Sequence, residues 1–149
     1  MATIPERLVT EMKLAMKAKA QLRLDTIRMM RTAIKNKEIE AGGELSDSDV
    51  ISVLSTMMKQ RRESAQVFRD NDRVEMAEKE EAELLVIQEF LPAQLDANAL
   101  RELVIQAIAA SGATSLRDMG AVMKLVAPQT VGRADGRVVS EMVKAQLTS

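Results

Sequence analysis

Apolar residues recur every three or four positions along most of the chain, a spacing that places them on one face of an α-helix. The clearest runs are Val50, Val53, Leu54 and Met57, and Leu100, Leu103, Val104, Ala107 and Ile108. No stretch alternates apolar and polar residues in the way that predicts a β-strand. The pattern therefore predicts an all-α fold.

Residues that begin or end helices divide this pattern into seven helices. Thr3 followed by Pro5 and Glu6 is typical of a helix start, and Ser46 and Asp96 are good N-cap residues. Glycines at 42, 43 and 112 and the proline at 128 are expected to end helices. The predicted helices begin near residues 4, 21, 47, 74, 97, 115 and 138 and end near residues 19, 41, 70, 90, 111, 127 and 147. The sixth helix has four expected apolar positions: Leu116, Met119, Met123 and Val126.

The pair Leu91-Pro92 interrupts the pattern between the fourth and fifth helices, because a residue before proline disfavours the α conformation. We therefore predict two helical domains. Residues 1–92 form an N-terminal four-helix unit, and residues 93–149 form a C-terminal three-helix unit.

The composition removes several classes of chemistry. The 149 residues include no His, Cys, Trp or Tyr, and only two Phe against eleven Met. The commonest general base and the thiolate nucleophile are missing, as are the His and Cys ligands of zinc. Acidic residues are dense between positions 70 and 89 but form no metal-binding motif. We expect no catalytic residue, no metal, no cofactor and a Met-rich aliphatic core.

Two expectations concern location. No segment approaches the roughly 18 uninterrupted apolar residues of a membrane span, so we expect no membrane partner. Charged Glu6, Arg7 and Glu11 stand where a secretory signal would be apolar, so we expect a cytoplasmic protein.

Basic residues are concentrated near the N-terminus. Nine lie between positions 7 and 37: Arg7, Lys13, Lys17, Lys19, Arg23, Arg28, Arg31, Lys35 and Lys37. On a helix, Arg28, Arg31 and Lys35 share one narrow stripe beside the apolar positions Ile27, Met30 and Ile34, and such a stripe can neutralise phosphates. The alternative is a solvated face paired internally with the acidic fourth helix.

The segment Gly132-Arg133-Ala134-Asp135-Gly136 is a second candidate site. Its glycines allow close backbone approach, Arg133 and Arg137 flank Asp135, and the next helix offers free N–H groups to an anion. Lys144 lies further along that helix. The alternative is a simple connection in which Asp135 is an N-cap.

These residues resemble the YqeY-like proteins of the GatB/YqeY group. The resemblance is carried by Lys-Gln-Arg-Arg-Glu-Ser-Ala from position 59, Phe90-Leu91-Pro92-Ala93-Gln94-Leu95, Asp118-Met119-Gly120-Ala121-Val122-Met123 and the segment 132–136. It implies a two-part all-α fold whose C-terminal part is related to the tail of the GatB subunit of the glutamine-dependent tRNA amidotransferase. In that family the tail contacts tRNA, while the kinase and amidase chemistry lies in domains that this sequence does not contain.

Three functions follow from the residues and the resemblance. The first is an accessory tRNA-binding module that uses Gly132, Arg133, Asp135, Gly136, Arg137 and Lys144, aided by Arg28, Arg31 and Lys35. The second is a protein-interaction module that docks an amidotransferase or aminoacyl-tRNA synthetase subunit. The third is a carbon–nitrogen ligase with glutamine as amide donor, against which the absence of Cys, His and an amidase signature argues.

Overall fold

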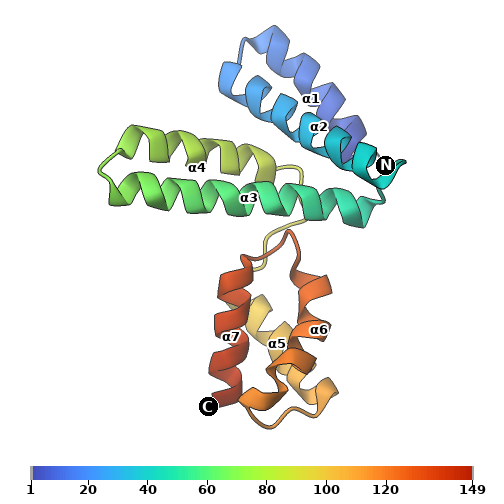
Figure 1. Ribbon diagram of the computed structural model, residues 1–149, viewed down its shortest axis with the longest axis vertical. Helices are drawn as coiled ribbons and strands as arrows, with labels where there is room; N and C mark the ends of the chain where they lie inside the picture. The colour runs from blue at the N-terminus through green and yellow to red at the C-terminus, as the bar shows by residue number, and fades with distance from the viewer. Residues whose placement is uncertain (1, 149) are drawn as a thin grey trace. The chain divides into compact units, whose positions relative to one another are not determined.

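The computed structural model describes residues 2–148 and confirms the all-α fold (Figure 1). Within that range there is no strand, and the chain forms seven α-helices and one short 3₁₀ turn. Their bounds are α1 Ile4–Ala18, α2 Gln21–Ala41, α3 Asp47–Asp70, α4 Val74–Gln88, α5 Ala97–Ser111, η1 Leu116–Asp118, α6 Met119–Thr130 and α7 Gly136–Thr148.

Local capping explains most helix ends. The Thr3 hydroxyl accepts a hydrogen bond from the Glu6 N–H, and the Glu6 carboxylate accepts one from the Thr3 N–H, which forms a capping box. Ser46 and Asp96 cap α3 and α5, because the side-chain oxygen of each accepts a hydrogen bond from the N–H three residues further on. Gly42 ends α2 with a φ of 76°, a conformation that glycine adopts without a steric penalty.

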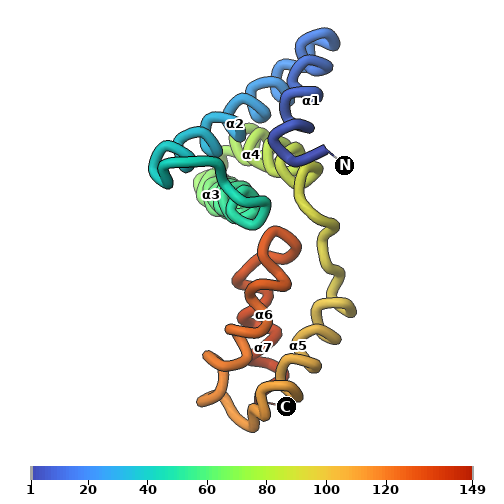
Figure 2. The backbone as a smooth tube through the Cα atoms, turned by 90° about the vertical axis from the view of Figure 1, so that its right-hand side faces the viewer, coloured from blue at the N-terminus to red at the C-terminus, as the bar shows by residue number. Residues whose placement is uncertain are grey.

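The chain divides into two compact units between Pro92 and Ala93, and each is described by itself. In the first unit, α1 pairs with α2 and α3 pairs with α4, and α2 packs against both members of the second pair. Figure 2 views α3 close to its axis, with α2 crossing it. The core of this unit is Leu8, Ile27, Met30, Ile34, Val50, Leu54, Met57, Met58, Val86, Ile87, Phe90 and Leu91.

In the second unit, α5, α6 and α7 pack against one another around a core dominated by valine. The buried side chains of this core are Leu100, Val104, Ala107, Val122, Val126, Val139 and Val143. Methionines 119, 123 and 142 lie at its edge, half-buried. The Met-rich core expected for the whole chain is therefore found in the first unit only, at Met30, Met57 and Met58.

Two local predictions for the second unit are wrong. Pro128 does not end the sixth helix, because α6 continues to Thr130. Thr130 is buried on the same face as Val126, four residues earlier, and its hydroxyl donates to the Val126 carbonyl at 3.1 Å. This packing holds the last turn despite the missing proline N–H. The prediction that Leu116 lies on the apolar face of the sixth helix is also wrong, because Leu116 lies in the 3₁₀ turn and is 43% exposed.

Candidate nucleic-acid interface

The turn from residue 132 to 136 connects α6 to α7. Gly132 has a φ of 75° and is buried, so the turn uses glycine's freedom at this position. One carboxylate oxygen of Asp135 accepts a hydrogen bond from the Arg137 N–H at 3.1 Å, and the Asp135 carbonyl accepts one from Val139 at 3.0 Å. Asp135 therefore caps α7, which is the connection role that the sequence offered as the alternative.

Arg133 binds its own chain. Its Nε donates to the Ala93 carbonyl at 3.2 Å and its Nη1 donates to the Gln129 carbonyl at 3.4 Å. The Arg133 carbonyl accepts a bond from the Leu95 N–H at 2.8 Å. The turn is thus tied to the segment that precedes α5, and two guanidinium nitrogens are already engaged.

Gln94 completes this connection, and the sequence analysis missed its role. Its side-chain nitrogen donates to the carbonyl of buried Gly132 at 2.7 Å, across 38 residues of chain. A buried carbonyl needs such a partner. Nothing local to Gln94 indicates this contact, because its partner is set by the packing of the whole unit.

Arg137 and Lys144 remain available on the outer surface of α7. Both are exposed and lie seven residues apart, a spacing that places them on the same face of the helix. Exposed Glu141 lies between them on that face. Of the predicted residues in the second unit, these two are exposed cations that form no ion pair among residues 2–148.

The basic stripe on α2 has the orientation that the sequence predicted. Arg28, Arg31 and Lys35 are exposed, while the neighbouring Ile27 and Met30 are fully buried. Among residues 2–148, Arg28 and Lys35 form no ion pair, and Arg31 donates only to the Met12 sulfur, at 3.2 Å. The stripe extends about 10 Å along the helix at 1.5 Å per residue.

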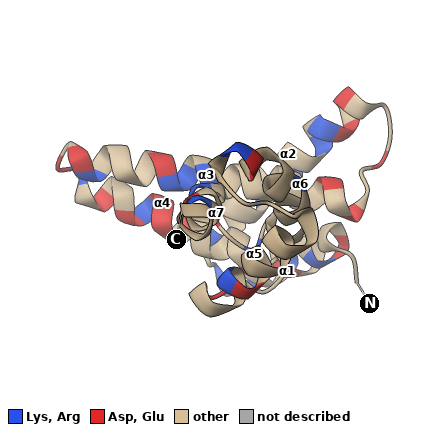
Figure 3. Ribbon diagram, turned by 90° about the horizontal axis from the view of Figure 1, so that it is seen from below, with Lys and Arg blue, Asp and Glu red and all other residues tan. Residues whose placement is uncertain are grey.

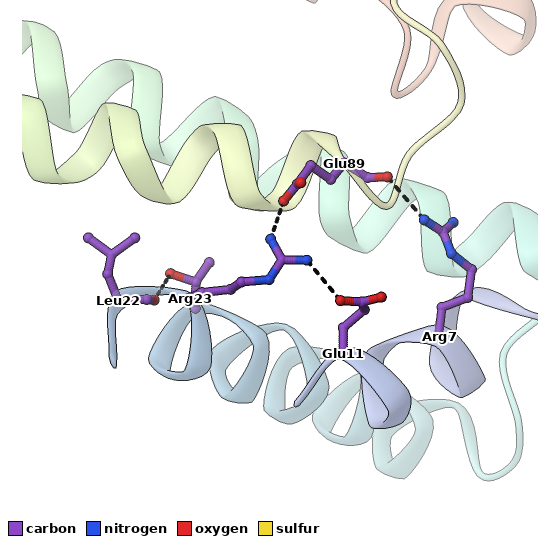
Figure 4. Close-up of polar contacts among 6 residues, drawn as sticks. Arg7, Glu11, Leu22, Arg23 and Glu89 are labelled. Atoms are coloured by element: carbon purple, nitrogen blue, oxygen red, sulfur yellow. Dashed lines mark hydrogen bonds and ion pairs between the residues drawn. The ribbon is translucent and has the colours of Figure 1, made fainter. Parts of the chain in front are cut away.

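Two other basic residues of the segment, Arg7 and Arg23, bond to groups within the first unit (Figure 4). Arg23 forms ion pairs with Glu89 and, at 3.2 Å, with Glu11, while Arg7 donates to the Glu89 carbonyl at 3.1 Å. Both guanidiniums also lie over the ring of buried Phe90, at 5.2 Å for Arg7 and 5.9 Å for Arg23. The hydrogen bond to Glu89 is the main cause that raises the pKa of Arg23 above its usual value. These residues fasten the end of α4 to α1 and α2.

The second basic cluster, on α3, is also partly internal. The Arg61 Nε lies 3.5 Å from a carboxylate oxygen of Glu83 on α4, with side-chain exposures of 14% and 10%. Burial, and then the nearby Glu80, raises the pKa of Glu83, while Arg61 opposes the rise. Both signs of charge lie along the α3–α4 hairpin (Figure 3), and acids are in excess on α4.

The predicted site residues therefore form two separate sets. Arg28, Arg31 and Lys35 lie in the first unit, and residues 132–144 lie in the second. Within residues 2–148, no group of His, Cys, Asp or Glu side chains is arranged to hold a metal ion. No described helix has the length and apolar character needed to cross a membrane.

Comparison with known proteins gives the family. A family model described as Yqey-like protein matches residues 5–147. Curated relatives named "Altered inheritance of mitochondria protein 41, mitochondrial" are 39% identical over 82 residues in Lachancea thermotolerans, 40% over 82 in Vanderwaltozyma polyspora and 37% over 84 in Clavispora lusitaniae. These matches cover 54–56% of this chain but 44–49% of each relative, so the chain spans less than half the length of these proteins.

The relatives correct one expectation. Their names place them in mitochondria, which contradicts the cytoplasmic location inferred from the charged N-terminus. Charge in the first residues tests only for a secretory signal, which is apolar, and carries no information about other compartments. The match over nearly the whole sequence agrees with the helical motifs described above, and the chain belongs to the YqeY-like protein family.

Proposed function

We propose that this chain is an accessory tRNA-binding module, related to the tail of the GatB amidotransferase subunit and without its catalytic domains. The observation that carries the proposal is the α2 stripe. Three cations project from one helix face, and two of them form no ion pair among residues 2–148. Cations without internal partners are free to replace the counterions of a phosphate backbone.

The surroundings of the stripe favour a polyanion. Residues 4–41, which contain α1 and α2, hold nine Lys and Arg against five Asp and Glu. Neither Phe90, which is 2% exposed, nor half-buried Phe68 presents a ring on which a base can stack freely. Recognition would therefore depend on phosphates and on the shape of the folded RNA.

The second unit would add Arg137 and Lys144 from α7. Arg133, which bonds to two carbonyls, would act by holding the turn in place. The proposal therefore predicts that removing Arg137 weakens RNA binding without unfolding, whereas removing Arg133 changes the second unit itself.

The test is a fluorescence-anisotropy titration of labelled tRNA with the full chain over a salt series. Each phosphate contact contributes about 0.7–0.9 to the slope of log affinity against log salt. The triple variant Arg28→Gln, Arg31→Gln and Lys35→Gln is expected to lower that slope by about 2–3. The matched control removes three exposed cations elsewhere, Arg73, Lys79 and Arg101. Equal losses in both variants, or no tRNA binding by the wild type at low salt, would refute the proposal.

One observation favours the alternative of protein docking. Several large apolar side chains are exposed on the first unit, including Val67 at 58% and Leu85 at 61% on the α3–α4 hairpin. Capture of an amidotransferase or synthetase subunit that survives nuclease treatment, and is lost in Val67→Ser with Leu85→Ser, would support that function instead.

A further inference from the structure

The outer face of α1 carries two lysines that the site described above does not include. Lys13 and Lys17 are exposed and lie one helical turn apart. Neither forms an ion pair among residues 2–148. Two residues, Lys19 and Ala20, separate α1 from α2, and the two helices pack along each other (Figure 1). The cations of the two helices can therefore belong to one surface.

The contacts of the residues before Lys13 establish the direction in which it projects. Successive residues of a helix are turned by about 100° around its axis. The Glu11 carboxylate pairs with Arg23 at 3.2 Å, on the side of the helix pair that faces the end of α4. The next residue, Met12, accepts a hydrogen bond from Arg31 of the α2 stripe at 3.2 Å. Lys13 is turned further in the same sense, away from Glu11. The α2 stripe therefore continues from Arg31, across Met12, to Lys13.

The resulting two-helix surface is positively charged. It contains five exposed cations from α1 and α2: Lys13, Lys17, Arg28, Arg31 and Lys35. Over residues 4–41, nine Lys and Arg stand against five Asp and Glu. Two of these acids form ion pairs within the segment, with Arg23 and Lys37. Seven cations then remain against three acids, so the segment keeps a positive excess that an anionic partner can neutralise.

We propose that the two-helix surface binds double-helical RNA, which rests on the tRNA-binding function proposed above and names the part of the RNA that is contacted. The axes of packed helices lie about 8–10 Å apart, so the cations form two rows in a fixed arrangement. A duplex also presents its phosphates in two fixed rows, and proteins recognise it through its shape and its phosphates. A flexible single strand would lose conformational freedom in order to follow both rows.

The aromatic residues of the chain do not support single-strand recognition. Proteins that bind single strands stack the bases on exposed aromatic rings. The sequence has no Trp, Tyr or His. Phe90 is 2% exposed and its ring lies under the guanidiniums of Arg7 and Arg23, while Phe68 is half-buried on α3. The two-helix surface thus offers charge and shape without stacking, which fits a duplex.

An anionic lipid surface fits these helices less well. Membrane-surface helices bury a continuous apolar face in the lipid. The apolar face of α1, with Leu8 and Ala15, is already buried in the first unit. The exposed apolar residues Leu14 and Met16 project about 160° apart around the helix axis. They form no face that could enter a bilayer, so the cations of α1 match the phosphates of a duplex better.

The experiment is a fluorescence-anisotropy competition with the full chain at low salt. Labelled tRNA is displaced by an unlabelled RNA duplex of about 16 base pairs, the length that one double-strand-binding domain spans, or by one strand of that duplex alone. We expect the duplex to compete about tenfold more strongly than the single strand at equal nucleotide concentration. Equal competition by the two would overturn the duplex assignment, while tRNA binding itself would stand.

A double variant tests the contribution of α1. Lys13→Gln with Lys17→Gln is expected to lower the slope of log duplex affinity against log salt by about 1.4–1.8, as the loss of two phosphate contacts requires. The control, Arg73→Gln with Lys79→Gln, removes two exposed cations of the α3–α4 hairpin and is expected to keep the wild-type slope. All four side chains are exposed, so both variants should fold. An unchanged slope in the α1 variant, or an equal change in the control, would overturn the proposal.

A last arm separates this proposal from the function on which it rests. If neither tRNA nor a directly labelled duplex binds, both are refuted. If the chain then sediments with phosphatidylglycerol vesicles, and the Lys13→Gln, Lys17→Gln variant does not, the two-helix surface binds lipid instead. If tRNA binds but the double variant binds it as tightly as the wild type, the tRNA function stands and α1 is not part of its surface.

Discussion

The substitution Arg133→Ala tests whether this side chain stabilises the second unit or contacts a phosphate. Sequence reasoning gave it a phosphate contact, but its guanidinium donates to the Ala93 and Gln129 carbonyls. In Arg133→Ala both bonds are lost. Charged hydrogen bonds contribute about 1.5–3 kcal/mol each when well formed. These two are long, at 3.2 and 3.4 Å, and exposed to solvent, so we expect a combined loss of about 1–2 kcal/mol.

Amide hydrogen exchange followed by NMR is the suitable assay, because it reports on each unit of the chain separately. A loss of about 1–2 kcal/mol should speed exchange of the core amides of α5, α6 and α7 by about 5- to 30-fold. Amides in α1 to α4 should exchange as in the wild type. Arg137→Ala is the matched control, since its side chain is exposed and its backbone N–H keeps the bond to Asp135.

The opposite combination of exchange and binding results would contradict this prediction. If Arg133→Ala left exchange in the second unit unchanged and lowered tRNA affinity as much as Arg137→Ala, Arg133 would contact RNA and its bonds to the chain would be unimportant. Gln94→Ala provides an independent check, because it leaves the carbonyl of buried Gly132 without its partner. A cost of about 1–3 kcal/mol is expected for such a group.

Two further predictions concern the first unit. Burial and Glu80 raise the pKa of Glu83. The protonated Glu83 side chain therefore stabilises the fold fully below about pH 4.3, where Glu titrates in an unfolded chain. This stabilisation is lost as the pH rises through the raised pKa. Urea unfolding of the wild type and of Glu83→Gln measures the difference between their free energies of unfolding. We expect this difference, wild type minus variant, to fall as the pH rises over this range, and a constant difference would contradict the prediction. Leu54→Ala should lower the free energy of unfolding by about 2–5 kcal/mol, because Leu54 is fully buried in the core. Leu14→Ala, at a half-exposed position, should change it by less than about 0.5 kcal/mol in the same assay.

The helix ends could be predicted because their causes are local. Thr3 bonds to a residue three positions away, as Ser46 and Asp96 do, so each cap is visible in a short stretch of sequence. Gly42 acts through its own backbone conformation. The all-α fold followed from these signals together with the spacing of apolar residues.

The errors and omissions arose where tertiary packing decides. Pro128 is a local helix-ending signal, yet buried Thr130 keeps the helix intact for another turn. The bond from Gln94 to Gly132 and the ion pair between Arg61 and Glu83 join residues that are far apart in sequence. No spacing rule relates such residues, because their meeting depends on how whole helices pack.

The sequence allowed two explanations for the basic N-terminal segment, a surface for phosphates and a face paired internally with acids. Each explanation fits different residues of the segment. Arg23 pairs with Glu89 and Glu11, while Arg28, five residues further along α2, forms no ion pair among residues 2–148. Five residues turn a helix by about 140° at 3.6 residues per turn, so one side of α2 faces α4 and another faces solvent. Charge at position 23 therefore acts mainly on the packing of the first unit. Charge at positions 28 and 35 has no such role there, and this is why their removal tests partner binding with little effect on the fold.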